Sequence, residues 1–414
     1  QEGNNLLKKG LHPLTLVDGY RKSLEIAKEQ INSDSIKIDD EKLLLVAETA
    51  LTGKGTEGAL DLFSSIIVES LTSISEVQTI PRAENIAMFK SNVGNIHDSR
   101  IIEGVAFRRR VLMDSLPNKL SDVKVAIISG DIKIRKMTRT AEIQITSANQ
   151  LEAFVDAEQD RKNSISQSLI DCGASLILCG GEIDRDILHN LADNNILAIG
   201  ELDSSEVENS ASATGAKIVD SIADIEIKDL GFCGSVLWER NEASDMVEDI
   251  IRIDGCKKPG LVTIEVGGAG EIATEEIIRG LHDGLRAVSL AIEDQEILPG
   301  GGAIHSRIAH AVRASSESEP GRGRLAMEAF SRAMETIPGA LVENSGNDTL
   351  DSILELRTAT RNQEYFMGID ENGKISVIDR AWHPRSVITE SLQLACETTI
   401  GMLRIDQVIS SRGD

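Results

Sequence analysis

The sequence is poor in aromatic residues and in cysteine, and each shortage limits what the protein can be. Phenylalanine, tryptophan and tyrosine make up 3% of the 414 residues, whereas hydrophobic residues make up 41%. Its cores must therefore be built mainly from leucine, isoleucine, valine and alanine, and this apolar content excludes a disordered chain. The five cysteines include no Cys-x-x-Cys pair and no histidine at metal-ligand spacing. We therefore expect buried thiols in a reducing compartment rather than a disulfide framework.

Positive charge and long apolar runs are also scarce. The 67 acidic and 43 basic residues give a formal net charge of −24, which repels nucleic acid and anionic membranes. No apolar stretch approaches the roughly 18 residues that a membrane-spanning helix needs, and the N-terminus lacks the basic-then-apolar layout of a signal peptide. We therefore expect a cytoplasmic protein that binds neither nucleic acid nor membrane.

The length and the periodicity of the chain indicate more than one domain. Apolar residues follow a helical period near both ends, for example in residues 13–31 and 41–72 at the start and 386–411 at the end. Between these ends, short apolar runs alternate with helical stretches, which is typical of an α/β layer with parallel strands. The expected strands are 123–130, 175–181, 196–200 and 216–220, and the expected helices are 149–171, 184–194, 271–295, 303–316, 323–337 and 386–411. This order predicts an α/β domain inserted into a helical one.

The sequence LPGGGAIH, residues 298–305, is the first candidate for chemistry. Three consecutive glycines leave the backbone bare, which suits close approach of a phosphate, sugar or base. A tight connection between helices explains the same glycines. We expect Asp283 on a helix that ends near Pro299, where its carboxylate could orient water or hold Mg²⁺. The alternative is that Asp283 is one solvated acid among many.

Two later segments have structural explanations of their own. In NSGNDTLDSILELR, residues 344–357, Asp348 or Thr349 is expected to cap a helix. Residues 365–384 indicate a short hairpin, closed by the residues Glu-Asn-Gly at 371–373 and followed by a helix.

In their order along the chain and in their amino-acid sequence, these segments resemble the group II chaperonins, which comprise the thermosome and its eukaryotic cytosolic counterpart. The resemblance covers essentially the whole chain, and it is carried by HPLTLVDGYRKSLEIA, LTGKGTEGA, LHDGL, LPGGGA, NSGNDTLDSILELR, GID and MLRIDQVIS. It implies a multi-domain α+β fold with three parts. A mostly helical equatorial ATPase domain takes 1–40 and 296–414, a small intermediate hinge domain takes 41–109 and 260–295, and an inserted α/β apical domain with a helical lid protrusion takes 110–259.

The resemblance also implies an activity, cofactors and partners. The chain is expected to be a subunit of an ATP-dependent molecular chaperone that folds polypeptides inside a double-ring chamber, with ATP and Mg²⁺ as cofactors. Its partners are then unfolded polypeptide clients and identical or paralogous subunits. The alternative is a non-hydrolysing structural subunit or a chaperonin-like scaffold.

Individual site residues follow from the same resemblance. Phosphoryl transfer depends mainly on positioning and charge stabilisation, and in the family an aspartate activates water while a lysine senses the terminal phosphate. The matching residues are Asp283 for water activation, Lys54 for the phosphate, Gly300, Gly301 and Gly302 against the nucleotide, Gly368, Ile369 and Asp370 beside the adenine, and His383 at the ribose. No protein metal ligand is assigned.

The chain departs from the family pattern at several places. These 414 residues do not contain the GDGTTT motif, whose backbone cradles phosphates and whose aspartate holds Mg²⁺. We therefore expect the N-terminal part of the equatorial domain to be missing and the chain alone to be inactive. His305 and His383 stand where the family has glutamate, and Ile388 replaces a lysine, so the nucleotide site is expected to be altered.

The expected apical domain contains one long helix with an unusual pattern. Thr146, Ser147 and Gln150 resemble a capping box that opens it. Leu151, Phe154 and Val155 then give way to a polar run before Ile165 and Leu169 resume, so the middle of the helix cannot be packed on both sides. By resemblance this region is the lid protrusion, and the alternative is an ordinary solvated helix face.

Overall fold

The computed structural model describes residues 1–75, 80–91, 94–134, 148–241, 248–257, 259–268, 270–361 and 364–403. The chain divides into two compact units, and each is described here by itself. Unit 1 comprises Gln1–Val68 and Arg279–Asp414, and unit 2 comprises Glu69–Ile278. The predicted intermediate domain contributes segments to both units, and the three domain boundaries stay a prediction.

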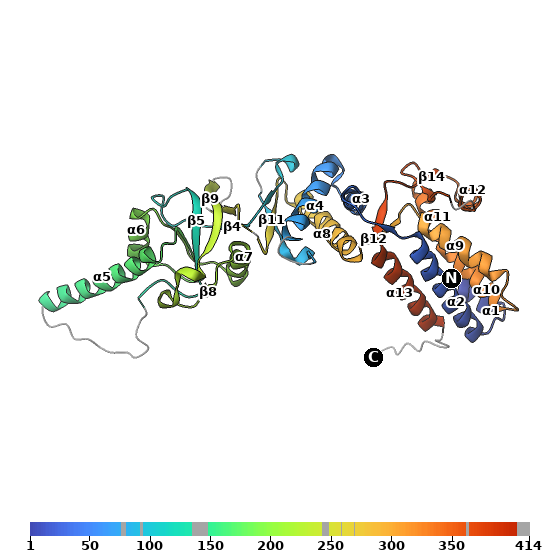
Figure 1. The fold of residues 1–414 in the computed structure, drawn as a ribbon, viewed down its shortest axis with the longest axis horizontal. Coiled ribbons are helices and arrows are strands. Elements are labelled where there is room, and N and C mark those ends of the chain that lie inside the picture. Colours follow the sequence, from blue (N-terminus) through green and yellow to red (C-terminus); the bar gives the residue numbers. More distant parts are fainter. Residues whose placement is uncertain are drawn as a thin grey trace, which may run out of the picture. The chain divides into compact units, whose positions relative to one another are not determined.

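Unit 1 is mostly helical (Figure 1). Its helices are α1 (Glu2–Lys8), α2 (Pro13–Asp34), α3 (Asp40–Leu51), the first part of α4 (Leu60–Ser75), most of α8 (Glu271–Asp294), α9 (Ala303–Ser316), α10 (Gly323–Met334), α11 (Thr336–Asn344), α12 (Thr349–Thr360) and α13 (Arg385–Leu403). Its strands are β1 (Ile36–Lys37), β12 (Glu296–Pro299), β13 (Met367–Ile369), β14 (Ile375–Val377) and β15 (Trp382–Pro384). The helices predicted from the sequence are confirmed where the structure describes them, although residues 404–411 of the predicted last helix lie outside the described part.

Helix α2 is the centre of the helical core. Its first turn begins with Pro13, whose missing N–H is not needed there, and the preceding His12 accepts the Leu14 N–H. The predicted apolar face is buried, namely Leu16, Tyr20, Leu24, Ala27 and Ile31. A Cβ atom at Gly19 would lie 2.4 Å from the Cβ of Ala326 on α10. The two helices therefore cross in direct backbone contact, which any larger residue at Gly19 would disrupt.

A small sheet corrects the expectation that the Asp283 helix ends near Pro299. Helix α8 ends at Asp294, and Gln295 takes a left-handed conformation with φ 55°. Strand β12 follows and pairs in antiparallel fashion with β1 on one side and β15 on the other. Ile297 and Leu298 are fully buried in this sheet, so apolar pairing with two strands distant in the chain ends the helix six residues before the first glycine.

A buried ion pair fastens α2 to α9. The Arg307 guanidinium donates to both carboxylate oxygens of Asp34, at 2.8 and 2.7 Å, and the two side chains are 10% and 3% exposed. Gln30 donates to the same carboxylate at 2.7 Å. Bidentate geometry and additional hydrogen bonds are what allow a buried pair to offset its loss of hydration.

Unit 2 is an α/β body with a mixed sheet. Its elements are β2 (Ile86–Lys90), β3 (Arg100–Ile102), β4 (Val105–Arg109), β5 (Lys119–Ile128), α5 (Ala148–Asp171), β6 (Leu176–Cys179), α6 (Arg185–Asp193), β7 (Leu197–Ile199), α7 (Ser204–Thr214), β8 (Ile218–Val219), β9 (Gly231–Asn241), β10 (Glu248–Asp254) and β11 (Val262–Val266). The main sheet has the order β4-β10-β9-β5-β6-β7, with β8 beside β5, and β2, β11 and β3 form a smaller sheet.

The prediction of parallel strands is confirmed for the four strands it named, which correspond to β5, β6, β7 and β8, but it left out the rest of the main sheet. Strands β6, β7 and β8 run parallel to their neighbours, as predicted, but β9, β10 and β4 pair in antiparallel fashion. The sequence analysis did not identify β9 and β10 because it relied on the alternation of strands with helices. Antiparallel strands such as these are held by contacts across the sheet, which that alternation does not reveal.

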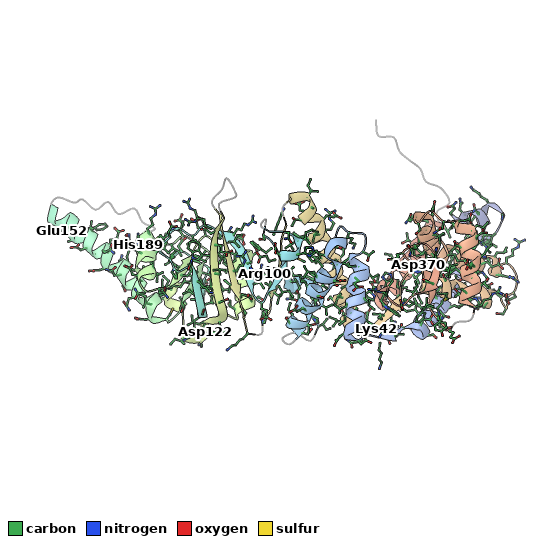
Figure 2. The ribbon with its side chains drawn as sticks, turned by 90° about the horizontal axis from the view of Figure 1, so that it is seen from above. Lys42, Arg100, Asp122, Glu152, His189 and Asp370 are labelled. Carbon is green, nitrogen blue, oxygen red and sulfur yellow. The ribbon has the colours of Figure 1, made fainter. Side chains whose placement is uncertain are left out.

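Helix α5 has two different halves. Ile165 and Leu169 pack against the core of unit 2, and Lys162 holds the same half to α6 through an ion pair with Asp186 at 2.6 Å. In the other half, Phe154 and Val155 are 48% and 55% exposed, and the helix extends beyond α6 (Figure 1), with Glu152 near its outer end and His189 on α6 (Figure 2). The predicted one-sided packing is confirmed. The capping residues at 146–147 lie outside the described part.

Two expectations from composition can be compared with the structure. Four cysteines are buried, Cys172 is half-buried, and all five carry free thiols, as predicted. Among the described residues, no helix has both the length and the apolar character needed to cross a bilayer.

Removing one member of the buried pair should strongly destabilise unit 1. Asp34→Ala leaves the Arg307 charge buried without its carboxylate, so we expect the free energy of unfolding to fall by about 3 to 5 kcal/mol. The matched control, Lys28→Ala, removes an exposed pair with Glu25 and should change it by less than about 1 kcal/mol. Urea titration followed by circular dichroism measures both, and equal effects would contradict the role given to Asp34.

Candidate functional site

The glycine loop is a turn between β12 and α9. Gly301 and Gly302 have φ values of 57° and 72°, a region that disfavours other residues, and Gly302 is the N-cap of α9. The Gly300 N–H donates to the Ala381 carbonyl at 2.7 Å, and the Gly302 carbonyl accepts the Ser306 N–H at 3.0 Å. The loop is thus held from both sides by backbone hydrogen bonds.

Contacts within the chain already require all three glycines. A Cβ atom at Gly300 would lie 3.0 Å from the Ala381 Cβ, one at Gly301 would lie 2.8 Å from the Ile369 carbonyl oxygen, and one at Gly302 would lie 2.8 Å from the Pro338 Cβ. Real Cβ contacts are rarely so short. The tight connection considered from the sequence therefore accounts for the glycines, and close approach of a ligand is not needed to explain them.

The segment of Gly368, Ile369 and Asp370 lies against this loop. The Ile369 N–H donates to the Gly301 carbonyl at 2.8 Å, and a Cβ at Gly368 would lie 2.7 Å from the same oxygen. The Asp370 carboxylate accepts the N–H groups of Asn372 and Lys374 at 2.9 Å each, which closes the β13–β14 hairpin. The predicted hairpin is confirmed, and Asp370 has a turn-forming role in it.

Two neutral histidines stand beside the loop. His383 on β15 pairs with Leu298, and its Nε2 would lie 3.1 Å from a Cβ at Gly300. Burial lowers the pKa of His383, and burial together with the nearby His383 lowers the pKa of His305 to about 4. The Nδ1 atom of His305 is buried, and among the described residues it has no hydrogen-bond partner. Both imidazoles are therefore uncharged at neutral pH. Sequence reasoning missed this pairing, because nothing in the spacing of the two residues indicates it.

Lys54 and Asp283 form a second group of site residues. The Lys54 Nζ lies 2.6 Å from the Asp283 carboxylate, and the side chains are 34% and 49% exposed. Two glycines of α8 allow this approach. A Cβ at Gly280 would lie 3.3 Å from the Lys54 Cβ, and one at Gly284 would lie 2.5 Å from the Ile67 Cδ1. In the described parts of the chain we find no hydrogen bond or ion pair that joins this pair to the glycine loop.

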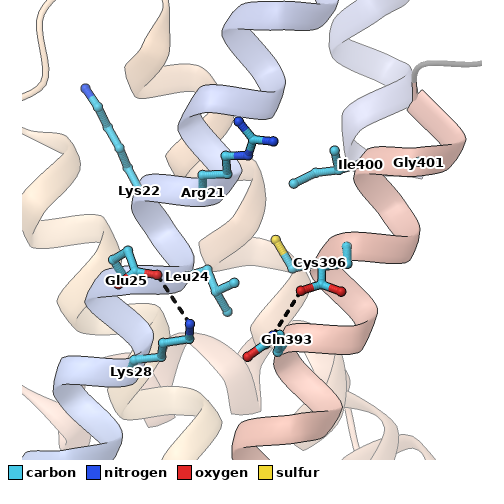
Figure 3. Close-up of a pocket in the computed structure, with 10 residues that line it drawn as sticks. Arg21, Lys22, Leu24, Glu25, Lys28, Gln393, Cys396, Ile400 and Gly401 are labelled. Atoms are coloured by element: carbon cyan, nitrogen blue, oxygen red, sulfur yellow. Dashed lines mark hydrogen bonds and ion pairs between the residues drawn. The ribbon is translucent and has the colours of Figure 1, made fainter.

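A groove elsewhere in unit 1 is separate from both groups. It has a volume of about 750 Å³ and lies between α2 and α13, with Leu24, Cys396 and Ile400 as apolar lining and charged residues such as Arg21 and Glu397 around them (Figure 3). No predicted site residue lines it. Ile388 is buried in the adjoining helical core. Within the described residues, no group of three histidine, cysteine or acidic side chains is placed to hold a metal ion.

An α/β body inserted between helical segments, with a glycine loop held by a hairpin, defines a chaperonin-type subunit. The chain belongs to the TCP-1/cpn60 chaperonin family, because the family model matches residues 1–412. It is 32% identical to thermosome subunit 1 of Haloferax volcanii, over 99% of this chain and 73% of that protein. It is 33% identical to thermosome subunit beta of Methanothermobacter thermautotrophicus, over 99% and 76% respectively.

A solved structure supports the same assignment. The open state monomer of a group II chaperonin from Methanococcoides burtonii matches 97% of this chain and 96% of its own, with a TM-score of 0.66 and 25% identity. The predicted fold class is confirmed, as is the role of a chaperonin subunit that acts in a ring-shaped folding chamber.

Acidification should destabilise unit 1 through His305. Its pKa is about 4 in the folded chain and about 6.5 in the unfolded chain, so the unfolded state binds more protons between these values. The free energy of unfolding should therefore fall by about 3 kcal/mol as the pH drops from 6.5 to 4. His305→Asn should remove this contribution to the pH dependence of the free energy of unfolding. The pH dependence that remains includes the contribution of His383.

The matched control for this prediction is His97→Asn, at an exposed position of unit 2. It should leave the pH slope unchanged in urea titrations between pH 4 and 7. If His305→Asn and His97→Asn behave alike, His305 is not buried in a neutral form.

Proposed function

We propose that the glycine loop and the Lys54–Asp283 pair together bind ATP with Mg²⁺ and hydrolyse it to drive a folding cycle. The observation that carries this proposal is the hydrogen bond from the Ile369 N–H to the Gly301 carbonyl, 2.8 Å long. It joins two segments that are distant in sequence and that the family resemblance assigns to a single nucleotide site.

The residues around the loop fit a nucleoside. Helix α9 begins at Gly302 without a side-chain cap, so its N-terminal dipole is available to a negative or polar group. A neutral imidazole at His383 accepts a hydrogen bond from a hydroxyl, as a ribose requires. Gly300, Gly301 and Gly302 would lie against the nucleotide, with Gly368, Ile369 and Asp370 beside the adenine. Bound Mg²⁺ would supply positive charge at the phosphates, as it does in other phosphoryl-transfer enzymes.

Lys54 and Asp283 fit the chemical step. An ionised carboxylate can accept a proton from water, and the Asp283 carboxylate lies 2.6 Å from the Lys54 Nζ. A lysine at the end of a flexible chain can move from a carboxylate to a phosphate, because it acts as a point charge with rotatable donors. We infer that Lys54 exchanges partners in this way and leaves Asp283 free to orient water.

Unit 2 fits the part of the subunit that contacts clients. The exposed half of α5, with Phe154 and Val155, is proposed as the lid protrusion, and the Lys162–Asp186 pair anchors its base. The equatorial, intermediate and apical boundaries given above belong to the same proposal. The partners are unfolded polypeptides and identical or paralogous subunits, and the expected location is the cytoplasm.

The second candidate, a non-hydrolysing structural subunit, is favoured by a specific observation. His305 and His383 replace carboxylates, and no GDGTTT motif occurs in these 414 residues. The chain spans 73% to 77% of the length of the thermosome relatives it matches. We propose that the phosphate-holding part of the site is missing from these residues and that they are inactive alone.

The 414-residue chain should therefore hydrolyse ATP only at a trace rate. Positioning accounts for about 7 to 11 kcal/mol of a barrier, and Asp283 cannot align water on a phosphate that is not held. Adding a family segment with GDGTTT ahead of residue 1 should restore phosphate release, and Asp283→Ala should abolish it there. The exposed acid Asp61→Ala is the matched control and should retain it. Asp283-dependent turnover by the unextended chain would contradict the proposal.

In the extended chain, His383→Glu should tighten ATP binding by about 1 kcal/mol. A carboxylate accepts a stronger hydrogen bond from a ribose hydroxyl than a neutral imidazole does. His189→Glu adds the same charge on α6 and should not change the dissociation constant measured by calorimetry. An unchanged constant for His383→Glu would show that His383 does not face the ribose.

A further inference from the structure

Cys233 and Cys256 flank a close contact between two strands at the base of the β9–β10 hairpin. The ladder ends at the Asp254–Ser235 pair, and beyond it the Gly234 N–H donates to the Gly255 carbonyl at 2.9 Å. Cys233 and Cys256 are the next residues beyond these glycines, and both belong to the hydrophobic core of unit 2. The two residues are far apart in sequence, and the sequence analysis gave them no role.

The backbone at this point suits a covalent link between the strands. One hydrogen bond joins Gly234 and Gly255, and Gly255 has φ 70°, so the regular ladder ends there and Cys256 follows a turn of the backbone. Disulfides span Cα distances of about 4.4 to 6.8 Å. A Cβ at Gly255 would lie 3.2 Å from the Gly234 Cα, so the two strands approach closely beside the cysteines.

The two thiols share a buried environment. Burial raises the pKa of Cys256, and the next largest cause is the neighbouring Cys233. Burial raises the pKa of Cys233 to about 12, and Asp254 contributes to both shifts. The residues are 0% and 4% exposed. At neutral pH both are therefore protonated and shielded, which keeps them reduced in the closed domain.

We propose that Cys233 and Cys256 are a latent disulfide site that hydrogen peroxide closes when the base of the hairpin opens. One thiolate attacks the peroxide, which breaks the O–O bond, forms a sulfenic acid and releases hydroxide. The second thiolate then attacks the sulfenic sulfur, forms the S–S bond and releases a second hydroxide. The two thiol protons neutralise these ions, so two thiols and one peroxide become one disulfide and two waters.

The link would fasten the β9–β10 hairpin near the edge strand β4. Cys256 lies two residues after the end of β10, and its N–H donates to the Glu103 carbonyl at 2.9 Å, next to β4. A bond from Cys256 to Cys233 would close a loop around the β9–β10 hairpin and join the end of β10 to β9. Closing a loop of this size restricts the unfolded chain, so the oxidised protein should resist unfolding of unit 2.

The test treats the full 414-residue chain with hydrogen peroxide under native conditions. Remaining thiols are alkylated, the chain is digested without reductant, and linked peptides are identified by mass spectrometry. We expect one dominant species in which the Cys233 and Cys256 peptides are joined, with a mass lower by two hydrogens than their sum. The melting temperature of the oxidised chain should rise, and reductant should reverse the rise.

Cys179→Ser is the matched control. Cys179 is also fully buried, and burial raises its pKa to about 11, but its Sγ donates to the Gly130 and Gly181 carbonyls instead of facing a cysteine. This variant should retain the link, whereas Cys233→Ser and Cys256→Ser should each abolish it.

Two results would overturn the proposal, and both are obtained with the peroxide-treated chain that carries no substitution. The first is oxidation of methionine without a joined peptide. The second is a mixture of cysteine pairings no richer in Cys233–Cys256 than the mixture formed in urea, which would mean that the native register does not direct the reaction. Neither result depends on whether a serine variant folds.

Discussion

The arrangement of unit 1 depends on the buried ion pair between Asp34 and Arg307. Asp34 is the last residue of α2, and Arg307 lies in the second turn of α9, the helix that the glycine loop opens. The same guanidinium lies over the Phe366 ring, 5.1 Å from its centroid, just before the hairpin that holds the loop. The Arg307 guanidinium thus contacts α2 and the start of the β13–β14 hairpin, and it is itself part of α9, the helix that follows the glycine loop. Because a buried charge tolerates few alternative partners, this contact specifies the arrangement more sharply than apolar packing does.

The glycine loop shows how packing and function can require the same residues. Each of its glycines faces protein atoms that a side chain would strike, so the loop has its shape before any ligand arrives. A site formed in this way needs little reorganisation on binding, which is how preorganised polar groups become effective. It follows that loss of activity in a glycine-to-alanine variant of this loop cannot by itself show contact with a nucleotide.

Sequence reasoning reached the local features and missed the long-range pairings. Helical periodicity gave the buried face of α2, and the turn residues at 371–373 gave the hairpin, because both signals lie within a few neighbouring residues. The interruption of α8 by β12, the antiparallel β9–β10 pair and the His305–His383 contact depend on partners distant in the chain. The spacing of residues within a short segment cannot reveal such contacts. The resemblance to group II chaperonins supplied the segments of the proposed site, but the Asp34–Arg307 pair beside them belongs to no sequence motif.

The two groups of site residues are joined through α3 and β15 rather than directly. Helix α3 leads into the loop that carries Lys54, and its Thr49 hydroxyl accepts the Trp382 N–H at 3.0 Å, next to His383. Glu48 adds an ion pair with Arg380 at 3.4 Å, but Arg380 is largely exposed, so the pair contributes little. Among the described residues, this neutral hydrogen bond of about 1 kcal/mol is the main polar contact between α3 and β15, in addition to the β1–β12 pairing. So weak a contact can break and re-form in the proposed partner exchange of Lys54, whereas the buried pair at Arg307 cannot. In the proposed ATP site, the glycine loop is therefore the fixed part and the Lys54 segment is the part able to move.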